Sequence, residues 1–306
     1  MKGLTNKDKE LLDYLFDYCR YTTKQLAKAL NLPQQTVSYR IKRLEDRNYI
    51  KRYDAVLNWD VIPLEKVIYL FKTNNPEEIA KKVKDIPCVH SVLTNTSTYN
   101  LSIFCFFKDK EQREDFESKY DFERKIKIDK VVASSSNLFD TEIKLKKPKM
   151  QEKQIELDDN DVKIIKHVST GHARDPILKI SKDLNMSYDI VQYRFMKLLK
   201  NKYFTRLIPQ TEGHFSKLKT TLIVMDFKEV KEETIKRLEN LSQLAIGGYN
   251  EKTVYLHIIS DDYKDYLEKL EEIHKATKRE QTNTETMHWK EIHLVNRYPL
   301  EYLIEP

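Results

Sequence analysis

The stretch that decides the fold is Thr22–Arg52, TTKQLAKALNLPQQTVSYRIKRLEDRNYIKR. The spacing of its apolar residues predicts a helix from about Thr23, a turn at Asn31–Leu32 and then a second helix. Pro33 is well placed to open that second helix, because its missing N–H costs nothing in a first helical turn. A basic strand, Tyr49–Tyr53, follows. This order is typical of a winged helix-turn-helix, in which the second of the two helices enters the major groove of DNA.

The helix expected over residues 33–47 has two different faces. Val37, Ile41 and Leu44 recur at i, i+4 and i+7, so their face must pack against the other helices. The opposite face carries amide, hydroxyl and cationic groups, which read base edges and hold phosphates. Arg40 lies at the edge of the apolar stripe, where a structural ion pair is an equal alternative to DNA contact. The predicted DNA contacts are Gln34, Gln35, Ser38, Tyr39, Arg40, Lys42, Arg43, Arg47, Lys51 and Arg52.

From about Lys66 the pattern changes to strands and amphipathic helices. Strands are expected at 67–73, 89–97, 100–107 and 127–139, with helices at 76–86 and 110–120. The order β-α-β-β-α-β is that of a ferredoxin-like domain, an antiparallel sheet with helices on one face. The uncovered face of such a sheet is available for pairing.

The second half of the chain repeats this plan. The helix expected from Leu4 to Cys19 matches a later segment at an offset of 153, and an insertion near residues 170–175 shifts the offset to 154. Eight of the 23 positions from Leu30 to Arg52 are identical to their counterparts in 184–206. The predicted fold class is therefore α+β, with two winged helix-turn-helix domains alternating with two ferredoxin-like domains. The predicted boundaries are 1–62, 63–143, a charged linker at 144–156, a degenerate winged helix-turn-helix at 157–213, and 214–306.

The second copy is chemically weaker as a DNA reader. An acid, a methionine and a threonine replace Gln35, Lys42 and Lys51. Each lost phosphate contact weakens binding uniformly across sequences. We expect the first winged helix to supply most of the sequence reading, and the second to add weaker or different contacts or to serve a protein interface. The contacts still predicted in the second copy are Tyr188, Gln192, Tyr193, Arg194, Lys197 and Arg206.

These features together resemble the Lrp/AsnC family of regulators. The resemblance is carried by LTNKDKELLDYL at the start of the chain, by LPQQTVSYRIKRLEDRNYIKRYDAVLN from Leu32, and by the β-α-β-β-α-β unit that follows. It implies a sequence-specific transcriptional regulator that binds double-stranded DNA. It also implies ferredoxin-like domains that dimerise and bind a small effector, often an amino acid. Two such domains in one chain are expected to form an intramolecular pseudo-dimer, which can associate further into a homo-oligomer.

The effector site implied by the resemblance is only partly matched. In that family a Gly and an Asp commonly mark the turn between the second and third strands of the ferredoxin-like domain. Lys252 stands where the Asp of the second copy would fall. The effector candidates are Ser97 and Asn100, at the best-matching positions of the first copy, and Gly247 and Gly248, upstream of that turn in the second.

The composition limits the classes of protein to which this chain can belong. The net charge of +6 and the pI near 8.8 fit a polyanionic partner. The cysteines Cys19, Cys88 and Cys105 have neither metal-binding nor redox spacing, which favours reduced core thiols. No apolar run approaches 18 residues, so we expect a cytoplasmic protein with no membrane partner. The sequence predicts no metal site, no cofactor and no catalytic residue.

An enzyme is the alternative. Some Lrp-like chains of this plan resemble siroheme decarboxylases of heme synthesis, which need basic and histidine side chains around a carboxylate-rich tetrapyrrole. The candidates here are His90, His257, His288 and His293, which are scattered in the sequence. The sequence shows no nucleophile–base pair, glycine-rich phosphate loop or carboxylate cluster, which favours the regulator.

Overall fold

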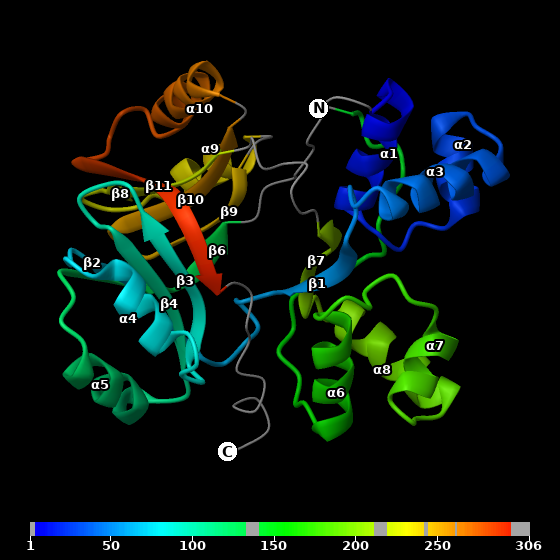
Figure 1. Cartoon of the computed structure of the whole chain (residues 1–306), viewed down its shortest axis with the longest axis horizontal. Helices are drawn as coiled ribbons and strands as arrows, with labels where there is room; N and C mark the ends of the chain where they lie inside the picture. The colour runs from blue at the N-terminus through cyan, green and yellow to red at the C-terminus, as the bar shows by residue number, and fades with distance from the viewer. Residues whose placement is uncertain (1–3, 133–140, 211–218, 242–243, 261, 295–306) are drawn as a thin grey trace. The chain divides into compact units, whose positions relative to one another are not determined.

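The computed structural model describes residues 4–132, 141–210, 219–241, 244–260 and 262–294 (Figure 1). It divides into two compact units, each built from both halves of the chain. The helical unit comprises Met1–Ile62 and Ser136–Lys217, and the sheet unit comprises Pro63–Ser135 and Leu218–Pro306. Two winged helix-turn-helix domains and two ferredoxin-like domains make up the fold, so the predicted α+β class is confirmed. The predicted boundary at 213/214 and the strand residues predicted at 133–139 lie outside the described residues.

In the helical unit each copy contributes three helices and one strand. Thr5 and Asp8 form a capping box at the start of the first helix, and Asp158 and Asp161 form the same box in the second copy. The repeated caps show that both copies begin their helices by the same local means. The elements are α1 (Asn6–Asp17), α2 (Thr23–Leu30), α3 (Gln34–Asp46), β1 (Arg52–Leu57), α6 (Asp159–Val168), α7 (Ile177–Asp183), α8 (Tyr188–Lys200) and β7 (Phe204–Gln210).

The turns of the two copies also share their backbone conformation. Asn31, which ends α2, has φ of 52°, and its counterpart Asn185 has φ of 52°. Asn48 after α3 and Lys202 after α8 both have φ of 57°. Asparagine adopts this left-handed region more readily than most residues. The left-handed conformation thus occurs after α3 and after α8, and Lys202 adopts it despite the less favourable residue type.

The strands that follow the recognition helices pair with each other. β1 and β7 form an antiparallel two-stranded sheet in which Arg52 faces Gln210 and Ala55 faces Leu207. The strand begins at Arg52, three residues later than predicted, because Tyr49 and Ile50 are buried beneath α3. The strand predicted as a DNA-binding wing therefore also joins the two copies.

The predicted linker at 144–156 contains neither helix nor strand. It is nevertheless attached to both copies. Lys147 forms an ion pair with Asp17 of α1 at 2.6 Å, and the Tyr203 hydroxyl donates to the carbonyl of Ile155 at 2.8 Å. The segment thus connects the two winged helices while remaining packed along them.

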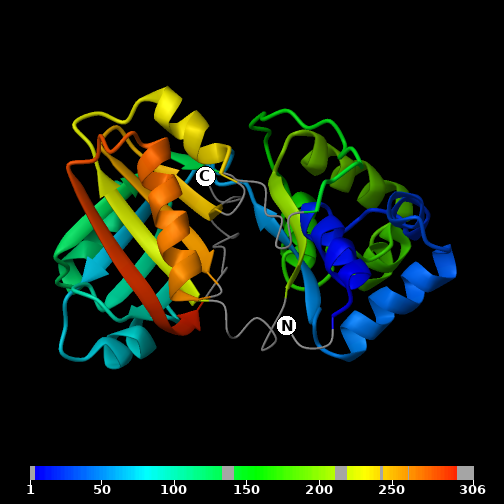
Figure 2. The same ribbon diagram turned by 90° about the horizontal axis from the view of Figure 1, so that it is seen from above.

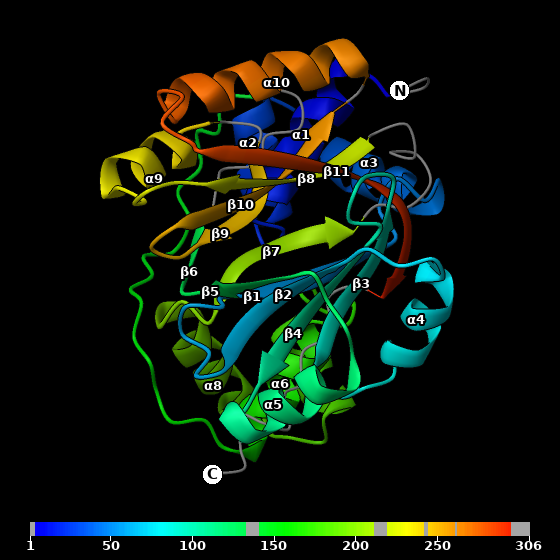
Figure 3. The same cartoon turned by 90° about the vertical axis from the view of Figure 1, so that its left-hand side faces the viewer.

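The sheet unit contains one antiparallel sheet with strand order β5-β2-β4-β3-β11-β8-β10-β9-β6. In the first copy α4 and α5 lie beside its strands, and in the second α9 and α10 do so (Figure 3). Figure 2 shows the orange helix α10 crossing the strands of the second copy. The elements are β2 (Glu65–Phe71), α4 (Pro76–Val83), β3 (Val89–Asn95), β4 (Leu101–Phe107), α5 (Lys110–Lys119), β5 (Arg124–Ile128), β6 (Lys130–Val132), β8 (Lys219–Asp226), α9 (Glu232–Glu239), β9 (Leu244–Tyr249), β10 (Thr253–Ser260), α10 (Tyr263–Ala276) and β11 (Asn283–Leu294).

Both faces of the sheet are buried. On the helix side each copy has its own apolar cluster, with Tyr69 and Phe107 in the first and Ile223 and Leu256 in the second. Every residue of β4 is buried, so its other face is covered as well. There the Phe104 ring lies 5.5 Å from the ring of Tyr255 in β10. The faces expected to be available for pairing are therefore packed against each other.

The last segment of the first copy was predicted as a single strand, but its described residues form two strands. It breaks at Asp129 into β5, which pairs with β2, and β6, which pairs with β9 of the second copy. Because β5 and β6 stand at the two ends of the strand order, this break lets the sheet close on itself. The alternation of buried and exposed residues also stops there, because Asp129 and Lys130 are both exposed.

Two further expectations concern the whole chain. Cys19, Cys88 and Cys105 are buried free thiols, and burial raises the pKa of Cys19 to about 12. This agrees with their interpretation as core residues. Within the described ranges, no helix has the length and apolar character needed to cross a membrane.

Candidate nucleic-acid interface

The outward face of α3 is polar and cationic. Val37, Ile41 and Leu44 are buried on the other side, as their spacing predicted. Tyr39 is 64% exposed. Within the described part of the chain, the other four side chains of this face form no hydrogen bond or ion pair, so their polar groups are available to a partner. The predicted contacts exposed here are Gln34, Gln35, Ser38, Tyr39 and Lys42.

Two residues of α3 that were predicted to contact DNA form ion pairs with α1 instead. Arg40 Nη1 lies 2.7 Å from Asp8 Oδ1, Arg43 Nη2 lies 2.6 Å from Asp8 Oδ2, and Asp8 is fully buried. Burial raises the pKa of Asp8, but hydrogen bonds from Thr5 and the charges of both arginines outweigh it, so its pKa lies below the ordinary value. These ion pairs fix the recognition helix on α1. Arg40 thus forms the structural ion pair that was considered as the alternative to a DNA contact.

Arg47, Lys51 and Arg52 continue the cationic surface after α3. All three side chains are exposed. Arg52 forms an ion pair with Asp54 at 3.0 Å, and the Lys51 amide donates to the Gln210 carbonyl at 2.8 Å. The pairing of β1 with β7 therefore fixes the backbone that presents these cations.

The outward face of α8 has a different chemistry. Val191, Phe195 and Leu198 are buried like their counterparts in α3. Tyr193 is 71% exposed and occupies the position that Tyr39 has in α3. The other exposed large apolar residues of α8 are Tyr188, Ile190 and Met196, and Asp189 and Gln192 are exposed beside them.

Three residues predicted to contact DNA in the second copy are instead ion-paired or partly buried within the protein. Arg194 Nη1 lies 2.6 Å from Asp158 Oδ2 and 3.1 Å from Asp161 Oδ1, and Lys197 Nζ lies 3.2 Å from Asp161 Oδ2. Arg206 of β7 is only partly exposed, and burial lowers its pKa to about 10. The cations that α8 and β7 would offer to a phosphate are thus fewer than those of the first copy.

The effector candidates of the first copy hold a turn together. The Ser97 hydroxyl donates to the Tyr99 carbonyl at 2.9 Å. The Asn100 amide donates to the Thr73 carbonyl at 2.6 Å and accepts from the Thr73 N–H at 3.0 Å. Asn100 therefore connects the turn between β3 and β4 to the end of β2.

The effector candidates of the second copy lie inside a strand. Gly247 and Gly248 belong to β9 and pair with β10 on one side and β6 on the other. A Cβ at Gly247 would lie 2.5 Å from the Tyr255 carbonyl oxygen, and one at Gly248 would collide with the Tyr255 ring. Both glycines thus allow Tyr255 to pack closely, and they do not occupy the turn position of the first-copy candidates.

The histidines considered for an enzyme do not converge on one site. His90 is buried 5.1 Å from the Phe106 ring, and His257 is partly buried, with its ring 5.2 Å from that of Trp289. Burial lowers the pKa of His257 to about 4. His288 lies 2.8 Å from the Thr221 hydroxyl. His293 is largely buried at the other end of β11.

His288 lines a small pocket of the sheet unit. Its volume is about 280 Å³, below the usual range for pockets that hold drug-sized ligands. None of the described lining residues is a lysine or arginine, so the pocket does not match the several carboxylates of a tetrapyrrole. The lining residues are Thr96, Thr220, Thr221, Ser260, Asp262, Tyr263, Tyr266, His288 and Trp289.

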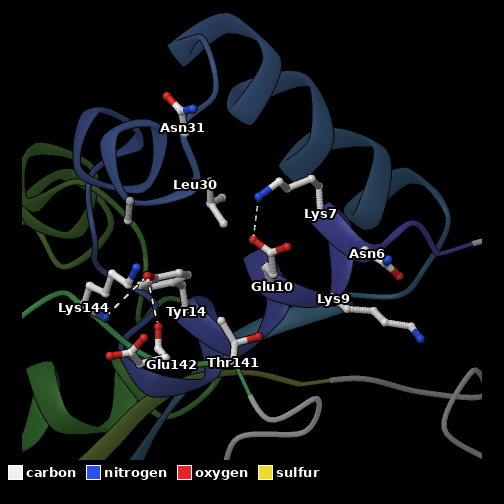
Figure 4. A pocket seen from close by; sticks show the side chains of 11 residues that line it. Asn6, Lys7, Lys9, Glu10, Tyr14, Leu30, Asn31, Thr141, Glu142 and Lys144 are labelled. Atoms are coloured by element: carbon white, nitrogen blue, oxygen red, sulfur yellow. Dashed lines mark hydrogen bonds and ion pairs between the residues drawn. The ribbon is translucent and has the colours of Figure 1, made fainter.

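A larger hollow of about 730 Å³ lies in the helical unit, between α1, the end of α2 and residues 141–144 (Figure 4). Lys7 on its rim is paired with Glu10 at 2.8 Å, and the Tyr14 hydroxyl donates to the Glu142 carbonyl at 3.4 Å. None of the predicted site residues lies in it. Its polar groups mainly serve to attach the linker to α1.

One cluster of functional side chains was missed by the sequence analysis. His167, His172, Asp175 and Asp183 meet in the second winged helix, with possible metal-ligand atoms within 4.8 Å of one another. His172 and Asp175 lie in the loop that carries the insertion near residues 170–175, and this departure from the repeat was the available signal.

Comparisons with known proteins agree with the first of the two winged helices. Residues 4–51 match the family model described as winged helix-turn-helix DNA-binding. An uncharacterized HTH-type transcriptional regulator of Pyrococcus horikoshii is 28% identical over 115 residues, covering 36% of this chain and 76% of that protein. The HTH-type transcriptional regulator FL11 of Pyrococcus furiosus is 24% identical over 120 residues, 38% of this chain and 80% of its own.

The whole fold is also found in a solved enzyme structure. The siroheme decarboxylase NirDL has a TM-score of 0.62 with 13% identity, covering 95% of this chain and 93% of its own. Its complex with an iron-uroporphyrin III analogue gives a TM-score of 0.63 at 12% identity. At these identities the likeness concerns the fold.

Proposed function

We propose that this chain is a sequence-specific DNA-binding transcriptional regulator of the Lrp/AsnC type, in a tandem-duplicated form. The observation that carries the proposal is the outward face of α3, where Gln34, Gln35, Ser38 and Lys42 are exposed and form no hydrogen bond or ion pair with the residues that the structure describes. The match of residues 4–51 to a DNA-binding family model and the names of the relatives support it.

In the proposed complex, α3 lies in the major groove. Gln34 and Gln35 at its N-terminal end present amides, which pair with adenine edges, and Ser38 presents a hydroxyl. Lys42 and the cations at Arg47, Lys51 and Arg52 hold phosphates and set the register. The Asp8 ion pairs keep α3 rigid on α1, which lowers the ordering cost of binding.

The two winged helices are proposed to form an intramolecular pseudo-dimer. The β1–β7 pair and the shared sheet connect the two copies within one chain. A symmetric dimer reads a palindrome, because its two reading heads are identical. Here the heads differ, so we propose an asymmetric operator with one strongly specified half, contacted by α3.

The test is selection of bound sequences from random duplex DNA with the untagged full chain, followed by affinity measurements over a range of salt. We expect one enriched half-site and a linear fall of log affinity with log salt concentration. Absence of any enriched motif, at salt concentrations where binding is measurable, contradicts sequence-specific reading. The double variant Gln34→Ala/Gln35→Ala is the matched control, because it removes base-reading amides and leaves the charge unchanged.

An amino-acid effector remains a weaker part of the proposal. The candidates Ser97 and Asn100 are engaged in a turn, and Gly247 and Gly248 serve strand packing. An effector would therefore have to bind elsewhere in the sheet unit, and the pocket beside His288 is the described hollow there of suitable size for an amino acid. Saturable heat of binding with any of the twenty amino acids would support this, and its absence would remove the effector.

The decarboxylase is kept as the second candidate because of the full-length fold likeness to NirDL. The chemistry of the pocket beside His288 does not favour it, since no cation among the described lining residues faces the hollow. The two functions separate in one titration. An iron-uroporphyrin that binds saturably with a shifted visible absorption band would favour the enzyme, whereas unchanged spectra together with sequence-selective DNA binding favour the regulator.

A further inference from the structure

Four potential metal ligands meet where α6, the following loop and α7 come together. His167 lies in the last turn of α6, His172 and Asp175 lie in the loop, and Asp183 ends α7. His172 Nδ1 is 2.8 Å from Asp175 Oδ2, and His167 Nε2 is 3.5 Å from Asp183 Oδ2. The two imidazole rings are stacked, with centroids 4.0 Å apart and planes 10° from parallel. One possible ligand atom from each residue lies within 4.8 Å of the other three.

The bonding of His167 is incomplete in the protein alone. Its Nε2 atom is buried and forms no hydrogen bond. A buried polar nitrogen without a partner costs free energy, so such atoms are uncommon unless a water or an ion completes them. Asp183 is exposed, so the cluster is open to ions from solvent.

The ligand set belongs to the second copy only. At the matching positions the first copy has Tyr14 for His167, Tyr21 for Asp175 and Ala29 for Asp183. There the two tyrosine rings pack edge to face, 6.4 Å apart. The second copy has thus exchanged an aromatic contact for two nitrogen and two oxygen ligands.

We propose that His167, His172, Asp175 and Asp183 form a binding site for a divalent transition-metal ion, with zinc as the best-matched ion. Imidazole and carboxylate together suit Zn²⁺ in a four-coordinate site. Tetrahedral coordination at ordinary Zn–N and Zn–O distances places the ligand atoms about 3.4 Å apart. The present separations of up to 4.8 Å require a contraction of up to about 1.4 Å. Side-chain rotation of the exposed Asp183 can supply part of it.

A lysine competes for this site. Lys179 Nζ lies 2.6 Å from Asp175 Oδ2, where it neutralises the carboxylate in the metal-free protein. A bound cation must displace Lys179 or share Asp175 with it. Removal of the lysine charge should therefore strengthen metal binding, which an ordinary network of ion pairs would not do.

The proposed metal site lies in a loop that contacts the first winged helix. The loop that carries His172 makes a β-bridge to Tyr53 of β1, and Ala173 N–H donates to the Tyr53 carbonyl at 2.9 Å. Arg20 of the first copy donates to the carbonyls of Ala173 and Asp175 at 2.8 and 3.0 Å. Metal binding would thus rigidify the loop that joins the two winged helices. An effect on DNA affinity rests on the proposed function, whereas the metal site itself does not.

The test is a titration of the untagged, chelator-treated full chain with Co²⁺, followed by visible absorption, and then displacement by Zn²⁺. We expect one Co²⁺ per chain with a d–d band, loss of that band as Zn²⁺ is added, and a higher thermal midpoint with Zn²⁺. His172→Ala and Asp183→Asn should weaken binding at least about tenfold, whereas Lys179→Met should tighten it several-fold. His274→Gln, which removes a histidine of the sheet unit, is the matched control and should bind like the parent.

Absence of saturable binding by either ion, or equal binding by Asp183→Asn and the parent chain, would overturn the site and leave an ion-pair network. Asp183→Asn is the decisive variant, because its exposed side chain makes loss of folding easy to exclude by circular dichroism. If Zn²⁺ binds as expected but no DNA sequence is selected, the metal site stands and the proposed function fails.

Discussion

The two recognition helices share a buried face and differ in the exposed one. Val37, Ile41 and Leu44 of α3 have apolar counterparts in α8, and both helices are anchored to an aspartate of the preceding first helix. On the exposed side, α3 presents amides, a hydroxyl and a lysine, whereas α8 presents mostly apolar groups and an acid. The comparison indicates that both helices have kept the buried apolar residues on which the fold depends. The exposed polar and cationic residues suited to DNA have been kept in α3 alone of the two.

The largest expected difference concerns the aspartate anchors. Asp8→Ala should destabilise the helical unit by about 3 kcal/mol, because it leaves two partly buried guanidinium groups without their carboxylate. Asp161→Ala should cost less, because Arg194 keeps its contact with Asp158 at 2.6 Å. Urea unfolding followed by the fluorescence of Trp59, in a Trp289→Phe background, measures both. Equal losses would contradict the difference between the two anchors.

Acid titration should separate the two units. The pKa of His257 is lowered to about 4, so between about pH 6.5 and 4 the folded sheet unit binds fewer protons than the unfolded chain. Its stability is complete above pH 6.5 and should fall by up to about 3 kcal/mol as the pH drops towards 4. The pKa of Asp8 is also lowered in the folded protein, but its contribution is lost only as the pH falls below the ordinary value of 3.8. The helical unit should therefore outlast the sheet unit in mild acid.

The variant His257→Leu tests this assignment. It should remove most of the acid sensitivity of the sheet unit between pH 6.5 and 4, measured by the fluorescence of Trp289 in a Trp59→Phe background. His274→Gln, on the partly exposed side of α10, should leave the profile unchanged. An unaltered acid profile in His257→Leu would assign the sensitivity to another group.

The smallest expected effect concerns phosphate contacts. Lys42→Ala should weaken DNA binding by about tenfold at 0.1 M salt and lower the salt slope by about one. Lys197→Ala should have little effect on DNA binding, because Lys197 already pairs with Asp161 at 3.2 Å. Fluorescence anisotropy at several salt concentrations measures both. Equal losses would show that α8 contacts the backbone as α3 does.

The sequence predicted those features that depend on local patterns. The apolar spacing of Val37, Ile41 and Leu44 and the repeat offset were sufficient for the recognition helix and for the fold class. The exposed contacts Gln34, Gln35, Ser38, Tyr39 and Lys42 followed from the same periodicity. Each of these inferences needs only the helical period of 3.6 residues.

Features that depend on tertiary contacts were not predictable in this way. The anchoring of Arg43 by Asp8 joins residues 35 apart in sequence, and the partner of β1 is more than 140 residues away. The break at Asp129 is fixed by pairing with β9, since the Asp129 amide donates to Tyr249 at 3.0 Å. The cluster at His167 was missed because its ligand spacing matches no familiar metal motif.

The most direct test of the central claim uses a matched pair of tyrosines. Tyr39 and Tyr193 occupy the same position on α3 and α8, and they are 64% and 71% exposed. A photocrosslinking amino acid placed at either position reports which helix lies against the DNA. We predict efficient crosslinking to the selected duplex from position 39 and little from position 193. Equal crosslinking from both positions, or stronger crosslinking from 193, would contradict the assignment of sequence reading to α3.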